Sequence, residues 1–155
     1  MDPSLEGYLT FIYSIMAVPP SVLPSDSPVI RFSYDMALDV VLRALYCVWS
    51  MPTSPSIYAV AVYNFAANTL ITYAPDIAGS EDPTFWSDLR KLYGLNSFTG
   101  GIINFSSDVS TSQGLAVPDA LKNLMIGDLA LLKTPYGRQY LAIAQSAGPG
   151  PWGIS

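Results

Sequence analysis

The sequence is organised around the segment Ile57–Tyr73, which reads IYAVAVYNFAANTLITY. It is apolar almost all the way round a helical projection, and such a helix is normally surrounded by neighbours. Asn64, Asn68 and Thr72 follow one another at intervals of four residues, so they form one narrow polar stripe on it. The segment therefore predicts a central helix against which the other helices pack.

A membrane span is the main alternative for this segment. No charged residue occurs between Arg43 and Asp76, and that length is sufficient to cross a bilayer. However, Pro52 and Pro55 interrupt the run, and the asparagines and threonines are costly in hydrocarbon without partners. We therefore expect no membrane contact, while a membrane or partner helix at Ile57–Tyr73 remains the alternative.

Prolines mark the expected helix starts along the rest of the chain. A capping residue followed by proline satisfies free amide groups and presets the backbone for the first helical position. Gly94 lies where a left-handed residue is expected to end the fourth helix. The five pairs that follow this pattern are Asp2-Pro3, Ser27-Pro28, Ser54-Pro55, Asp82-Pro83 and Thr134-Pro135.

Apolar spacing supports these helices. The first is expected to reach Val18 and the third to stop before Pro75. Further helix is expected at 118–121, with a pause near Gly127. The apolar face of the first helix carries Leu5, Leu9, Ile12 and Met16, and that of the second carries Tyr34, Leu38, Val41, Leu45 and Val48.

A polar excursion interrupts this helical pattern. Residues 96–114, NSFTGGIINFSSDVSTSQG, are rich in Ser, Thr, Asn and Gly and predict a long loop or loose hairpin. Loops of this length in compact domains are usually functional. We therefore predict an all-α fold, a helical bundle of about five helices in a single domain over residues 1–145, with loop 96–114 inserted and an extended C-terminal tail at 146–155.

The composition favours a protein whose surface is covered. Half of the residues are hydrophobic and only 12% are charged, against about 25% in an ordinary soluble domain. Such a surface is typical of subunits that pack against others. The net charge of −5 also argues against general nucleic-acid binding, which needs clustered basic residues.

Catalytic patterns are scarce in the sequence. It contains no histidine, and Cys47 lies among apolar neighbours, where a thiolate is disfavoured. Gly100 and Gly101 lack the spacing and the lysine of a phosphate-binding loop. We therefore expect no enzyme, no cofactor and no metal. A small histidine-free enzyme that uses Asp35 and Asp39 is the less favoured alternative.

Aromatic side chains are the feature of this chain that is most typical of protein interfaces. The chain has ten tyrosines and three tryptophans. Trp49, Tyr63 and Trp86 are expected in the core. Tyr136, Arg138, Tyr140 and Trp152 are expected at an interface.

The C-terminal third of the chain carries a family resemblance. The phrase TPYGRQYLAIAQ, which begins at Thr134, resembles the "TPYGQQYL" phrase that often opens the last helix of small tailed-bacteriophage adaptor proteins. The Tyr- and Ala-rich segment from Ile57 and the Ser-rich loop GIINFSSDVSTSQG are similar in kind to parts of the same family. The resemblance covers roughly Ile57 to Gln145.

This resemblance implies a head-tail connector, or head-completion protein, located in the virion neck and assembled in the host cytoplasm. Its implied partners are the portal protein, a tail or stopper neck protein, further copies in a ring that is commonly twelvefold, and genomic DNA that passes through the lumen without sequence-specific binding. The implied portal-docking residues are Thr134, Tyr136, Gly137, Arg138, Tyr140, Leu141 and Trp152, and the implied intersubunit or tail-contact residues are Gly101, Ile103, Phe105, Asp108 and Val109.

Overall fold

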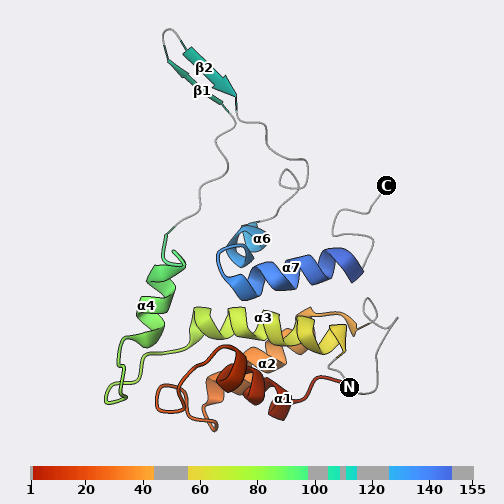
Figure 1. The fold of residues 1–155 in the computed structure, drawn as a ribbon, viewed down its shortest axis with the longest axis vertical. Coiled ribbons are helices and arrows are strands. Elements are labelled where there is room, and N and C mark those ends of the chain that lie inside the picture. Colours follow the sequence, from red (N-terminus) through yellow and green to blue (C-terminus); the bar gives the residue numbers. More distant parts are fainter. Residues whose placement is uncertain (1, 44–55, 98–104, 109–110, 115–125, 148–155) are drawn as a thin grey trace.

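The computed structural model describes residues 2–43, 56–97, 105–108, 111–114 and 126–147, and these residues form an all-α fold, as predicted (Figure 1). Two short strands lie within the polar excursion. The elements are α1 (Leu5–Thr10), the π-helix η1 (Phe11–Ile15), α2 (Pro28–Val40), α3 (Ile57–Tyr73), α4 (Phe85–Leu92), β1 (Phe105–Asp108), β2 (Thr111–Gly114), α6 (Ile126–Leu131) and α7 (Pro135–Ala147).

Helix α3 lies at the centre of the helices. Helix α7 packs along one side of it, and α1 and α2 lie on the other side (Figure 1). Its side chains at Ala61, Val62, Ala66, Leu70 and Ile71 are completely removed from solvent. The expectation of a central helix with neighbours around it is thus confirmed.

Aromatic rings fill the core between α1, α2 and α3. The ring of Tyr8 stacks on Tyr34 at a centroid distance of 5.8 Å and on Tyr63 at 6.0 Å. The Tyr8 hydroxyl also shares a hydrogen bond of 3.1 Å with Ser33 Oγ. Trp86 is fully buried and Tyr63 nearly so, which confirms the predicted core positions for both. Trp49 lies outside the described residues.

The predicted helix starts are correct at two of the five proline pairs. Ser27 precedes Pro28 of α2, and the Thr134 hydroxyl accepts a hydrogen bond from Gly137 N at the start of α7. The other three described helix starts lie two residues later than predicted, at Ser4, Ser56 and Thr84.

Side-chain capping explains the shift of these starts. Ser4 Oγ accepts from Gly7 N and Ser56 Oγ accepts from Ala59 N, each over 3.1 Å, so these hydroxyls satisfy amides at the first turn. Asp82 Oδ1 instead accepts from Thr84 N over 3.3 Å, so its carboxylate supports the turn before α4.

Three further predictions concern the end of the second helix, the pause near Gly127 and the end of the fourth helix at Gly94. The third is confirmed, whereas the first two differ from the structure. The second helix ends at Val40 because Val41 is extended, with φ −84° and ψ 101°, so the predicted stripe stops there, and Leu45 and Val48 lie outside the described residues. Gly127 lies inside α6, so the predicted pause at that residue is wrong. Gly94 has φ +62°, as expected for the residue after a helix.

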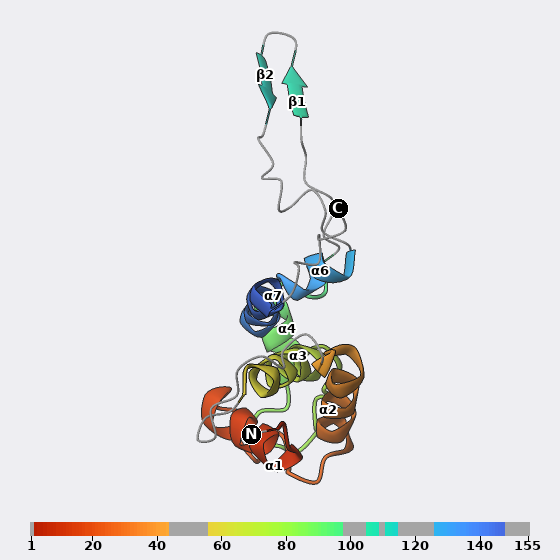
Figure 2. The ribbon, with the colours of Figure 1, turned by 90° about the vertical axis from the view of Figure 1, so that its right-hand side faces the viewer.

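The hairpin stands apart from the helices (Figures 1 and 2). Its strands are antiparallel and pair Phe105 with Gly114 and Asp108 with Thr111. A hairpin within the polar excursion was one of the two predicted forms. Helix α7 continues to Ala147, so the predicted tail from residue 146 begins two residues too early. The other tail residues and the expected helix at 118–121 lie outside the described residues.

Candidate functional site

Thr134 joins the start of α7 to α3. Its hydroxyl donates a hydrogen bond of 2.6 Å to Asn68 Oδ1 and accepts one of 2.9 Å from Gly137 N. The residue is completely buried. Asn68 belongs to the polar stripe of α3, so this stripe provides a partner for the cap of another helix.

Gly137 lies where α7 approaches the end of α6. A methyl group added at this position would lie 2.8 Å from the carbonyl carbon of Leu131 and 2.9 Å from its Cα, and it would also overlap the carbonyl oxygen. These are backbone atoms of the preceding helix, so the contact cannot be relieved by a side-chain rotation. Glycine is therefore required by the distance between the two backbones.

Tyr136 and Tyr140 face the body of the protein. The ring of Tyr136 meets Phe11 edge-on at 6.1 Å, and the ring of Tyr140 meets Phe65 of α3 edge-on at 5.0 Å. Burial raises the pKa of the Tyr136 hydroxyl, with a smaller contribution from Tyr93. Burial also raises the pKa of the Tyr140 hydroxyl, with a contribution from Asp128. Both phenols are therefore neutral over the physiological pH range.

The predicted docking residues consequently do not form one exposed surface. Leu141 is only 8% exposed, and Thr134, Tyr136, Gly137 and Tyr140 hold α7 against its neighbours. Sequence reasoning missed this because an aromatic face that packs on a neighbouring helix has the same pattern as one that binds a partner. The side of α7 that solvent reaches instead carries Arg138, Gln139, Ala142, Gln145 and Ser146.

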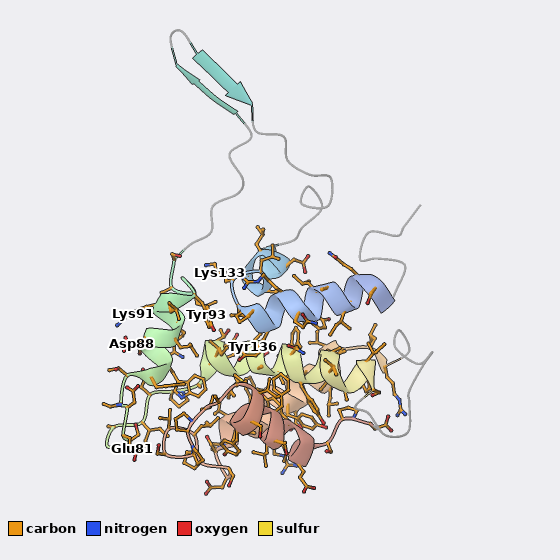
Figure 3. All side chains as sticks on the ribbon, viewed as in Figure 1. Glu81, Asp88, Lys91, Tyr93, Lys133 and Tyr136 are labelled. Carbon is orange, nitrogen blue, oxygen red and sulfur yellow. The ribbon has the colours of Figure 1, made fainter. Side chains whose placement is uncertain are left out.

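Lys133 was not predicted, although it has a clear role. Its ammonium group donates to the carbonyl oxygens of Gly94, over 2.8 Å, and Ser97, over 2.5 Å. A cation at this end of α4 is also favoured by the helix dipole. Figure 3 shows Lys133 beside the C-terminal end of α4. The two hydrogen bonds connect the turn before α7, which contains Lys133, to Gly94 and Ser97 at the N-terminal side of the polar excursion.

Asp76 and Arg90 form a second junction that the sequence did not indicate. Asp76 Oδ1 accepts from Trp86 N over 2.9 Å and from Ser87 N over 3.2 Å, and the Ser87 hydroxyl donates to the other carboxylate oxygen. These hydrogen bonds, that from the Ser87 hydroxyl above all, lower the pKa of Asp76, and Arg90 nearby adds to the effect. Arg90 Nη1 donates to Ala74 O over 2.7 Å, so the pair joins the end of α3 to the start of α4.

The outer side of α2 carries an exposed apolar row. Phe32, Met36 and Val40 are four residues apart and are 47%, 39% and 44% exposed. Tyr73, at the end of α3, is 62% exposed and meets Phe32 edge-on at 5.9 Å. Figure 2 shows α2 at the edge of the helical part, with its outer side facing away from the other helices. We call these four residues the α2 patch.

The predicted loop residues are only partly located. Phe105 begins β1 and Asp108 ends it, beside the turn of the hairpin. Gly101, Ile103, Val109 and Trp152 lie outside the described residues. Among the described candidates, Phe105 and Asp108 therefore lie in the hairpin, apart from the candidates on α7.

The acidic residues of α2 form an exposed charged row. Arg31 Nε lies 3.7 Å from Asp35 Oδ2, and both side chains are mostly exposed. Arg43, four residues beyond Asp39, forms an ion pair of 3.1 Å with Asp2. In the part of the chain that the structure describes, no group of three acidic or cysteine side chains is placed to hold a metal.

None of the described helices has both the length and the hydropathy that a membrane crossing requires. Comparisons with protein-family models, with curated proteins and with solved structures each found no match to this chain.

Proposed function

We propose that the protein is a structural subunit of the neck of a tailed bacteriophage. In this proposal it forms an oligomeric ring that joins the capsid portal to the tail and surrounds part of the DNA conduit. The resemblance of the segment from Thr134 to Gln145 to the last helix of adaptor proteins supports the assignment to the neck. The α2 patch is the single observation that carries the general role in assembly.

The physical argument starts from the small number of charges. A chain with 12% charged residues has few groups to keep its copies apart, and the α2 patch leaves four large apolar side chains in contact with water. Contiguous apolar surface of this kind marks interaction sites in soluble proteins. Subunits of a ring remove such surface from water.

The DNA conduit is compatible with the charge of the chain. A net charge of −5 would repel phosphate groups, so the genome would slide through a ring of these subunits without being held. The acidic balance therefore supports passage of DNA rather than binding.

The proposed portal contact differs from the one that the resemblance implies, because some of the implied residues are buried. Tyr136, Tyr140 and Leu141 would orient α7, while its exposed side with Arg138 and Gln139 would contact the portal. The projecting hairpin would reach a neighbouring subunit or a tail protein. Its separation from the helices in Figure 1 supports this division of roles.

Co-expression with the portal protein encoded in the same genome tests this proposal. We expect a stable complex on size exclusion and ring-shaped particles in negative-stain images. The double variant Arg138→Glu, Gln139→Glu, co-expressed with the portal in the same way, should form less complex. Its circular dichroism spectrum should remain as helical as that of the wild-type protein. Separate elution of the wild-type protein and the portal at all concentrations would contradict the proposal.

A further inference from the structure

The α2 patch lies beside a row of charges on the same helix. Arg31, Asp35 and Asp39 are four residues apart and exposed, each one position before Phe32, Met36 and Val40 in turn. The apolar row and the charged row therefore run side by side along α2. The two rows are about 100° apart around the helix axis, so a helix that packs on the apolar row has the charged row along its edge.

The charged row is complementary to itself in one orientation. Arg31 and Asp39 lie at equal distances on either side of Asp35, about 6 Å along the helix. A second α2 that runs antiparallel across this face places its Asp39 opposite Arg31 and its Arg31 opposite Asp39. A parallel arrangement would instead place like charges together.

The apolar row obeys the same symmetry. Its middle residue is Met36, which is one position, or about 1.5 Å along the axis, from Asp35. One two-fold axis therefore brings Met36 of each copy together and places Phe32 of each copy near Val40 of the other. Asp35 meets its counterpart on this axis, but Arg31 of the same helix lies 3.7 Å away and offsets that repulsion.

Asp39 is the group that gains most from such a pairing. Among the described residues it forms no ion pair and no hydrogen bond, whereas Asp35 has Arg31. We propose that α2 is a self-association surface, on which a second copy of this chain docks antiparallel through the α2 patch and two Arg31–Asp39 ion pairs.

This contact goes beyond the neck proposal and does not depend on it. A two-fold contact uses the same patch on both copies, so it closes after two copies and cannot generate a cyclic ring alone. It would operate in the free protein, where the α2 patch is not yet covered by a ring contact, so the dimer and the ring are alternative assemblies. A single pair of helices makes a small interface, so the association should be weak and concentration-dependent.

Sedimentation velocity of the isolated protein over a range of concentrations tests the contact. We expect the wild-type protein to shift from monomer to dimer as its concentration rises. Met36→Asp should remain a monomer throughout, because it places charge at the centre of the patch. Leu92→Asp is the matched control: Leu92 is 77% exposed on α4 and should leave the dimer unchanged.

A charge exchange tests the orientation. Arg31→Asp and Asp39→Arg should each weaken dimerisation about three- to tenfold, since each variant loses both ion pairs across the axis. The double variant restores opposite charges across the axis and keeps an ion pair with Asp35 within the helix, so it should recover most of the affinity. A wild-type protein that stays monomeric, or a double variant as weak as the single variants, would overturn the proposal.

Discussion

The Thr134 hydroxyl donates a hydrogen bond of 2.6 Å to Asn68 Oδ1, and so joins the residue before α7 to the polar stripe of α3. The same oxygen accepts from Gly137 N, so one buried side chain both caps a helix and fixes its position on the central helix. The segment that resembles an adaptor phrase thus has a structural role that is independent of any partner.

Replacement of Thr134 by valine should destabilise the protein by about 2 kcal/mol. The variant loses a helix cap and leaves Asn68 Oδ1 without its donor in a partly buried site. Thr134→Ser keeps the hydroxyl and should retain most of the stability. Urea denaturation followed by circular dichroism measures both, and equal stability of the valine variant and the wild-type protein would refute the role of the cap.

Two glycine substitutions should have opposite effects. Gly137→Ala forces a methyl group onto the backbone of Leu131, and we expect a loss of about 2 kcal/mol or more. Gly127→Ala in α6 meets no atom within 4 Å and should stabilise by up to about 1 kcal/mol through helix propensity. Thermal unfolding of the two variants distinguishes them, and a neutral Gly137→Ala would show that α6 and α7 are not so close.

Asp76 should contribute stability that depends on pH. Its pKa in the folded protein is lowered from the ordinary value of 3.8, so the ionised carboxylate favours the folded state. That contribution is complete above about pH 4 and disappears as the pH falls through the lower, folded pKa. The stability difference between the wild-type protein and Asp76→Asn should therefore shrink below about pH 4, as measured by urea unfolding at several pH values. A difference that stays constant down to pH 2 would contradict this assignment.

Lys133 should hold the C-terminal end of α4 in place. Lys133→Met removes the ammonium group but keeps most of the aliphatic chain, and it should cost about 1 kcal/mol. The specific effect is faster amide hydrogen exchange around Gly94 and Ser97. Lys91→Met is the control, because Lys91 is exposed and its ion pair among the described residues is with Asp88 on its own helix. Equal exchange at these residues in both variants would exclude the proposed fastening.

The sequence was sufficient for the class of fold and for the central helix. A segment such as Ile57–Tyr73 is apolar on every side, and only neighbours on several sides remove that surface from water. Gly94 and the starts of α2 and α7 were also predictable, since each depends on local backbone chemistry. The starts at Ser4 and Ser56 were missed because a serine hydroxyl competes with the nearby proline signal.

The junctions between helices were beyond reach of the sequence. Lys133 and Gly94 are 39 residues apart, and Arg90 reaches the carbonyl of Ala74 across a turn. Nothing in local periodicity indicates such partners. Tyr136 and Tyr140 illustrate the same limit, because amphipathic spacing does not distinguish a helix that packs on its own protein from one that binds another.

The neck proposal predicts that the genome encoding this chain produces tailed virions, and immunogold labelling of those virions is its most direct test. Antibody raised against the purified protein should label the junction between head and tail, and particles without this protein should lack attached tails. Labelling confined to the capsid shell or the tail fibres, or particles that join heads to tails normally without this protein, would contradict it.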